Sequence, residues 1–264
     1  MNFWYDRSLM QLYLIRHAQS RNNALYARNG TDEGRMADPP LTELGHHQAR
    51  LLAQFIASEP QSLPGDTTLV SHYAARHDRR GFGLTHLYCS LMVRAIQTGC
   101  YLSEATGLPL VAWQDVHERG GLHRIDEESG EDIGVPGPNR AWFAAEYPQL
   151  MLPVELGDIG WWNRPMELVE DAAPRARRLW MQLLERHDNE SDRVAVVTHG
   201  GFFQSLMSVL LNIENGSLSD LFGAYRVGYG MSNVSISRLE IGGGYVNIRY
   251  LNRIDFLPDE LVTG

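Results

Sequence analysis

Short apolar runs that predict buried strands alternate along the chain with longer stretches whose apolar residues recur at helical spacing. Strands are predicted over residues 12–15, 85–90, 108–113 and 194–198. Helices are predicted over residues 42–59, 93–106, 139–147 and 166–187, and a turn into a helix over 199–211. Residues 233–241 and 245–251, on either side of Gly242–Gly244, predict two late strands in a hairpin. This order favours an α/β sandwich with a mainly parallel central sheet.

Two stretches interrupt the pattern. Residues 60–83 combine prolines, glycines and charges, and they predict a surface loop insertion that we expect to be mobile. Residues 120–165 are rich in Gly, Pro, acidic residues and Trp, and they predict a lid over one edge of the sheet. Within the lid, Trp161 and Trp162 are expected to pack against the core. We expect residues 1–264 to form a single domain that contains both insertions.

Composition narrows the possible partners and chemistry. The net charge is −9 and the pI about 5.5, which argues against nucleic acid or an anionic membrane as the main partner. All 23 cationic residues are arginine, so chemistry that depends on a lysine is excluded. The two cysteines are expected to be reduced and buried. Neither a signal peptide nor an apolar run of about 18 residues is present, so a cytoplasmic location is expected.

Charged and polar side chains stand where the predicted strands end. Arg16 and His17 follow the first strand, Arg94 lies just after the second, and Glu118 lies just past the third. His199 follows the fourth strand. Because ligands of parallel sheets bind beyond the carboxyl ends of the strands, these five side chains are expected to meet on one rim.

Such a rim suits the transfer of a phosphoryl group. Guanidinium groups offer paired donors to phosphate oxygens, and the helix that opens at Gly200-Gly201 offers free N–H groups to an anion. Nearby positive charge lowers the pKa of a histidine, and a neutral imidazole is a nucleophile. A nearby carboxylic acid could protonate the leaving oxygen. The sequence therefore predicts phosphoryl transfer through a phosphohistidine, without a metal ion.

Five motifs in the same order resemble those of the histidine phosphatase superfamily, in its phosphoglycerate-mutase-like branch. They are RHAQSRNN (16–23), DPPLTELGHHQA (38–49), SLMVRAIQT (90–98), ERGG (118–121) and VTHGG (197–201). The resemblance covers most of residues 10–255 and implies a three-layer α/β/α sandwich with a lid insertion. Ala18 stands where the family has glycine, and Gln19 stands where it has glutamate, which removes a negative charge beside the site.

The resemblance implies a role for each residue of the rim. His17 would be the phosphorylated nucleophile, and Glu118 would protonate the leaving group and then activate water. The phosphoryl oxygens would be held by Arg16, Arg94 and His199. Further substrate contacts would come from Ser20, Asn23 and Gly200. No metal ion or cofactor is expected.

The implied function is a metal-independent phosphatase that hydrolyses a small phosphomonoester. One alternative is a 2,3-bisphosphoglycerate-dependent phosphoglycerate mutase, and Glu118-Arg119 resembles that enzyme. The mutase signature continues with Tyr-Gly and Gln-Gly elements and an Arg-Arg pair that are missing here, so the phosphatase is favoured. A second alternative is a non-catalytic module that binds a phosphorylated ligand or a protein. The expected partner is a small phosphorylated metabolite, and a homodimer is compatible with the family.

Overall fold

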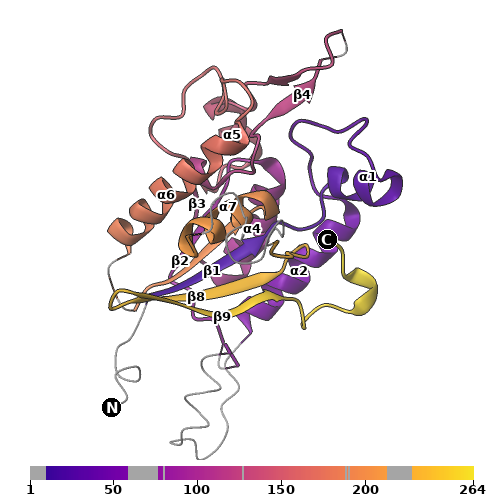
Figure 1. Cartoon of the computed structure of the whole chain (residues 1–264). Helices are drawn as coiled ribbons and strands as arrows, with labels where there is room; N and C mark the ends of the chain where they lie inside the picture. The colour runs from indigo at the N-terminus through magenta and orange to yellow at the C-terminus, as the bar shows by residue number, and fades with distance from the viewer. Residues whose placement is uncertain are drawn as a thin grey trace, which may run out of the picture.

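The computed structural model describes residues 10–58, 77–79, 81–126, 128–187, 189, 191–212 and 228–264. Within these residues a seven-stranded sheet has the order β6-β3-β2-β7-β1-β8-β9 (Figure 1). Five neighbouring strands are parallel: β6 (Leu150–Met151), β3 (Leu110–Ala112), β2 (His86–Cys89), β7 (Arg193–Thr198) and β1 (Met10–Arg16). The other two strands form an antiparallel hairpin at one edge: β8 (Ile236–Gly242) and β9 (Tyr245–Arg253).

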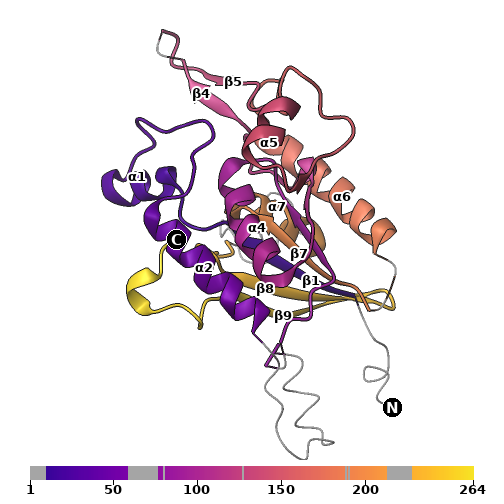
Figure 2. The same cartoon turned by 180° about the vertical axis from the view of Figure 1, so that it is seen from behind.

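Helices cover both faces of the sheet, and this confirms the predicted α/β/α sandwich. Alternate residues of β1 point into different cores: Tyr13 and Ile15 into one, Leu12 and Leu14 into the other. The first core lies under α2 (Glu43–Ala57) and α4 (Val93–Thr106). The second lies under α6 (Val169–Arg186) and α7 (Gly200–Leu210). Figure 2 shows α2 and α4 on the face opposite to α6.

Capping residues in the sequence predicted several helix ends correctly. The Thr42 hydroxyl accepts a hydrogen bond from the Gly45 N–H at 3.0 Å, which caps α2. Gly107 ends α4 with a φ of 72°, a conformation that glycine adopts without steric cost. Asn139 caps α5 (Arg140–Glu146). The prediction for α6 was wrong at its start, because the backbone is extended at Leu168 and the helix begins at the next residue.

The short or polar elements were not predicted. Helix α1 (Arg21–Asn29) has no buried residue, so it lacks the apolar periodicity that would reveal it. Strands β4 (His123–Ile125) and β5 (Asp132–Gly134) form a separate hairpin, and like β6 they are too short to show an alternating pattern. Two 3₁₀ turns, η1 (Gln114–Val116) and η3 (Asp259–Leu261), were also not predicted.

The two interrupting stretches differ in how much of them is described. Most of residues 60–83 lies outside the described residues, but two that are described, Asp78 and Phe82, are buried. Residues 120–165 include the β4–β5 hairpin, α5 and β6, the last of which joins the main sheet. Trp161 and Trp162 are each 3% exposed and lie in the core, as expected.

The cysteines are free thiols, as predicted, although Cys89 is fully buried and Cys100 only partly. In the described part of the chain, no helix combines the length and the apolar character needed to cross a membrane.

Candidate active site

The parallel pairing of β1, β7 and β2 brings the predicted rim together. Arg16 lies beside Thr198 in the β1–β7 register, and the His17 N–H donates to the Thr198 carbonyl oxygen at 3.0 Å. On the other side of β7, Cys89 lies beside Val197, so Ser90 and the start of α4 follow at the same edge. The segments that follow all three strands therefore begin side by side.

A cavity of about 580 Å³ opens at this edge. Six of the eight predicted site residues line it: Arg16, His17, Ser20, Asn23, Arg94 and Glu118. His199 and Gly200 are not among the lining residues. The His199 ring is fully buried with its centroid 5.0 Å from that of His17, and Gly200 lies beside the Arg16 guanidinium.

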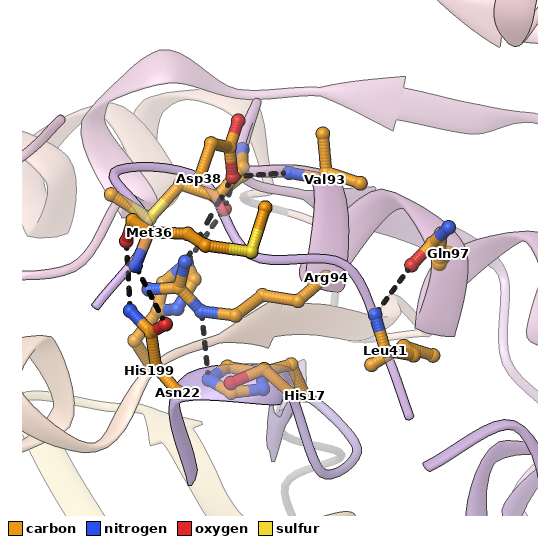
Figure 3. Close-up of polar contacts among 12 residues, drawn as sticks. His17, Asn22, Met36, Asp38, Leu41, Val93, Arg94, Gln97 and His199 are labelled. Carbon is orange, nitrogen blue, oxygen red and sulfur yellow. Dashed lines mark hydrogen bonds and ion pairs between the residues drawn. The ribbon is translucent and has the colours of Figure 1, made fainter. Parts of the chain in front are cut away.

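His17 is held as a neutral imidazole with one nitrogen turned to the cavity. Its Nδ1 lies 2.7 Å from the Ala18 carbonyl oxygen, and its Nε2 accepts a hydrogen bond from Arg94 Nε at 3.1 Å (Figure 3). Because Nε2 accepts, the proton is on Nδ1. Burial holds the pKa of His17 well below its usual value, and the charges of Arg94 and Arg16 lower it further. Burial, which the sequence argument left out, is thus the larger cause.

Arg94 is oriented by Asp38, which the sequence analysis quoted in a motif without giving it a role. One Asp38 oxygen, Oδ1, accepts from the Val93 N–H at 3.0 Å and lies 3.9 Å from Arg94 Nη1 (Figure 3). Burial raises the pKa of Asp38 to about 6, although Arg94 and the Val93 N–H both oppose the rise. No local pattern marks a carboxyl group that folding buries, so this residue could not be found from the sequence.

Two buried donors at the site lack acceptors among the described residues. Ser90 Oγ accepts from the Met92 N–H at 3.3 Å and lies 2.7 Å from His199 Nε2, and its hydroxyl can donate to that nitrogen or accept from it. In the tautomer in which Ser90 donates to Nε2, His199 Nδ1 carries a hydrogen, and no protein acceptor in the described residues faces it. Arg16 Nε is also buried and has no acceptor among the described residues. Buried donors without acceptors are costly, and such a pair suits an anionic ligand.

Glu118 binds at the N-terminus of α7. Its carboxylate accepts from the backbone N–H groups of Gly201 at 3.1 Å, Phe202 at 2.9 Å and Arg119 at 2.8 Å. The N–H groups at Gly200-Gly201 were predicted to favour an anion, and at Gly201 the anion in the structure is the Glu118 carboxylate. A Cβ on Gly201 would lie 2.4 Å from Glu118 Oε1, so only glycine allows this contact.

Ser20 and Asn23 form hydrogen bonds within the protein, in addition to the substrate contacts predicted for them. Ser20 caps α1, and Asn23 Oδ1 accepts from the Ser20 N–H at 3.0 Å and from Asn233 at 3.3 Å. These contacts engage the Asn23 Oδ1 oxygen, and Asn23 is one of the residues that line the cavity. The Gln19 side chain accepts from the Thr42 hydroxyl at 2.7 Å, and Gln19 is not among the residues that line the cavity.

A buried ion pair supports the segment before Glu118. Arg175 on α6 binds Glu167 with two hydrogen bonds of 2.6 and 2.7 Å. Its remaining nitrogen donates to the carbonyl oxygens of Asp115 at 2.7 Å and His117 at 3.0 Å. The sequence analysis missed both ion-pair residues, because a charge in an amphipathic helix normally faces solvent.

One group of side chains has the composition of a metal site. Ligand atoms of His86, His187 and Asp192 lie within 4.8 Å of one another, at the amino ends of β2 and β7 and thus opposite the cavity. Both nitrogens of His187 already have partners: Asp192 at 2.8 Å and the Tyr88 hydroxyl at 3.1 Å. These contacts give the group a structural role in the fold.

The chain matches the model of the histidine phosphatase superfamily, branch 1, over residues 12–71 and 70–254. A protein of Hydrogenobacter thermophilus named "Putative phosphoserine phosphatase 2" is 23% identical over 93% of this chain and 97% of its own length. "Probable phosphoglycerate mutase GpmB" of Photorhabdus laumondii is 47% identical, but over only 19% of this chain and 21% of its own length.

Solved structures share the fold. The mycobacterial glucosyl-3-phosphoglycerate phosphatase superposes with a TM-score of 0.53 at 21% identity, covering 92% of this chain and 98% of the other. Phosphoserine phosphatase of Entamoeba histolytica, in complex with 3-phosphoglyceric acid, gives a TM-score of 0.55 at 17% identity. It covers 95% of this chain and 100% of the other.

Proposed function

Because the chain belongs to branch 1 of the histidine phosphatase superfamily, we propose that it is a metal-independent phosphatase that hydrolyses small phosphomonoesters through a phosphohistidine at His17. The observation that carries the proposal is the neutral His17 Nε2, which faces a cavity beside two buried donors that lack protein acceptors. In this proposal the two donors, Arg16 Nε and His199 Nδ1, donate hydrogen bonds to phosphoryl oxygens. The relatives named as phosphatases support the same activity.

The phosphoryl group binds between the two guanidiniums. Arg94 exchanges its hydrogen bond with His17 for the phosphoryl oxygens, which frees the Nε2 lone pair. Arg16 and His199 donate to the remaining oxygens, and the Asn23 amide adds a further donor. These fixed donors stabilise the charge that builds up on the equatorial oxygens in the transition state.

The reaction then proceeds in two displacements. Nε2 of His17 forms a bond to phosphorus as the ester P–O bond breaks, and Glu118 in its acid form gives its proton to the leaving oxygen. Glu118, now a carboxylate, next accepts a proton from water. This water attacks phosphorus, the N–P bond breaks, and neutral His17 and inorganic phosphate result.

A phosphoglycerate mutase is the second candidate, favoured by one observation. Arg119 follows Glu118 and lines the same cavity, as the mutase-like Glu-Arg pair requires. In a mutase, the phosphohistidine returns its phosphoryl group to the substrate rather than to water, and the enzyme needs a bisphosphorylated primer. The non-catalytic alternative is disfavoured, because Glu118 lines the cavity together with His17.

The first experiment is phosphate release from p-nitrophenyl phosphate and a panel of phosphorylated metabolites, in the presence of EDTA. His17→Ala is compared with His47→Ala, which removes an exposed histidine on α2 outside the cavity. We expect release that EDTA does not affect, that His47→Ala retains and that His17→Ala abolishes. Acid-labile phosphate on the wild-type chain, absent from His17→Ala, would identify the intermediate.

Two other outcomes would change the proposal. Release that appears only with 2,3-bisphosphoglycerate, together with exchange between phosphoglycerates, would indicate the mutase. A folded His17→Ala variant that keeps full activity would overturn the phosphohistidine mechanism.

A further inference from the structure

The peptide unit between Ala18 and Gln19 determines how the His17 ring is presented. Its carbonyl oxygen, that of Ala18, lies 2.7 Å from His17 Nδ1 and accepts the proton that the ring carries there. Its N–H group, that of Gln19, donates to Gln48 Oε1 at 2.8 Å. In a planar trans peptide the N–H and C=O groups point in opposite directions, so Gln48 fixes the direction of the Ala18 carbonyl oxygen.

The Ala18 contact matters most while the substrate is bound. In the free enzyme, Arg94 Nε also donates to His17 Nε2 at 3.1 Å, and this hydrogen bond favours the same tautomer. In the proposed reaction, Arg94 exchanges that bond for the phosphoryl oxygens. Among the described residues, the Ala18 carbonyl oxygen is then the remaining contact that keeps the proton on Nδ1 and leaves Nε2 as the nucleophile.

The Gln48 side chain is itself oriented by the segment that follows β9 and returns to α2 (Figure 1). Gln48 is fully buried, and its Nε2 donates to the Leu261 carbonyl oxygen at 2.7 Å and to Thr263 Oγ1 at 2.8 Å. A carbonyl oxygen can only accept, so the amide nitrogen must face Leu261. The amide oxygen Oε1 must therefore face the Gln19 N–H.

Thr263 connects Gln48 to the backbone of His17. Because Gln48 Nε2 donates to the Thr263 hydroxyl, the hydroxyl proton is available to Asn233, whose Oδ1 accepts it at 2.9 Å. The fully buried Asn233 in turn donates from Nδ2 to the His17 carbonyl oxygen at 3.0 Å. Hydrogen bonds that run in one direction polarise and strengthen one another, so Gln48, Thr263 and Asn233 restrain His17 together.

A strained residue adjoins this network. Val234 is fully buried and has a φ of 57°, a conformation that is costly for a β-branched side chain. Its N–H also donates to the His17 carbonyl oxygen, at 3.4 Å. Such strain persists only where the surrounding contacts determine the backbone, and it is concentrated at functional sites.

We propose that Gln48, held by Thr263, is a positioning residue for phosphoryl transfer, which keeps the His17 proton on Nδ1 so that Nε2 attacks phosphorus. This inference rests on the proposed phosphatase function of the same cavity. It also gives the segment around Thr263, remote from His17 in the sequence, a part in catalysis. A purely structural role for Gln48 would affect stability and leave the His17 tautomer unchanged.

The first measurement is the tautomer of His17, read from ¹⁵N shifts of histidine-labelled protein saturated with inorganic phosphate. The signal is assigned by its absence from His17→Ala. We expect one tautomer in the wild-type chain, with the proton on Nδ1. Gln48→Met is similar in size but removes the acceptor for the Gln19 N–H, so it should show exchange between the two tautomers.

The second measurement is the rate of p-nitrophenyl phosphate hydrolysis, expressed per folded chain with the folded fraction taken from circular dichroism. In Gln48→Met, kcat should fall by about 10- to 100-fold, because the nucleophilic nitrogen is no longer held in one state. The KM and the inhibition constant of inorganic phosphate should change by less than about twofold, because the phosphate donors are untouched.

Thr263→Val tests the same network at a half-buried position, and it decides the question if Gln48→Met does not fold. It removes the hydroxyl between Gln48 and Asn233, so kcat should fall by about three- to tenfold, the effect of one hydrogen bond. Thr263→Ser keeps the hydroxyl and should keep the wild-type rate and tautomer. The matched control is Thr106→Val, which removes a hydroxyl that bonds within α4 outside the cavity and should change neither.

The inference requires the tautomer and kcat to change together. A change in only one of them in Gln48→Met, or a loss in Thr263→Val that Thr263→Ser shares, would overturn it. If the wild-type chain hydrolyses no phosphomonoester, the proposed function fails and the ¹⁵N signal alone decides. Two tautomers in Gln48→Met would then still support the hold of Gln48 on His17, and a single one would refute it.

Discussion

Replacement of Arg175 by methionine is expected to destabilise the fold and to slow catalysis together. The Arg175 side chain is 2% exposed, and its guanidinium forms two hydrogen bonds to Glu167 and two to backbone carbonyl oxygens of the segment before Glu118. It also packs 4.7 Å from the centre of the Phe202 ring. Methionine keeps most of the volume but removes the charge and all four hydrogen bonds.

The expected loss is about 3–5 kcal/mol in the free energy of unfolding, the usual cost when one partner of a buried ion pair is removed. Glu167, whose side chain is 9% exposed, would remain as a buried charge without its partner. The double variant Arg175→Met/Glu167→Leu removes that charge as well. It should recover at least about 2 kcal/mol relative to the sum of the single variants, which is the signature of a coupled pair.

Urea unfolding followed by tryptophan fluorescence measures these differences. The matched control is Arg177→Met, an exposed arginine on the same helix, which should change stability by less than about 0.5 kcal/mol. A cost below about 1 kcal/mol for Arg175→Met, or additive effects in the double variant, would refute the reasoning.

The effect on catalysis follows from the two carbonyl contacts. They tether Asp115 and His117, the residues just before Glu118, so their loss should let the carboxylate move from its place at α7. We expect kcat for p-nitrophenyl phosphate to fall by about 10- to 100-fold with little change in KM, because misplacement by about 1 Å can have this effect. An unchanged kcat in a destabilised but folded variant would show that Glu118 is positioned by other contacts.

Three further predictions concern the buried groups of the site. Below pH 6.5 the unfolded chain protonates its histidines while three deeply buried ones stay neutral in the folded state, so stability should fall as the pH falls. Asp38 has a pKa of about 6 in the folded state, above its unfolded value, so it takes up a proton in the folded state. This proton offsets one of the three that the unfolded chain binds on its histidines. The free energy of unfolding should therefore fall by about 3 kcal/mol per pH unit between pH 6 and 5. Urea unfolding at stepped pH checks this, and a flat profile would contradict it. Gly201→Ala should lower kcat at least about tenfold, because its Cβ would displace Glu118. Gly228→Ala should not lower kcat, because no described residue lies within 4 Å of its Cβ. Equal rates for the two variants would contradict the contact between Gly201 and Glu118. Ser90→Ala removes the hydroxyl that contacts His199 Nε2, so inhibition by inorganic phosphate should weaken about tenfold. The inhibition constant measures this effect. An unchanged constant would place His199 outside the phosphate site.

The sequence by itself determined the order of the longer strands and helices and the residues at the ends of those strands. These features depend on neighbours in the chain: apolar runs, a threonine before a helix, a glycine after one. Arg16 and His17 had to lie at the carboxyl end of a buried strand, because the apolar run ends immediately before them. Parallel pairing then placed them beside His199, as the α/β pattern predicted.

Only the tertiary structure decided what each of these groups contacts. The contact of Glu118 with Gly201 joins residues 83 positions apart, and that of Gln48 with Thr263 joins residues 215 apart. Asp38 has a raised pKa only because folding buries it. Contacts between distant residues and the loss of water around a charge have no local signature in the chain, because both arise when separate elements pack together.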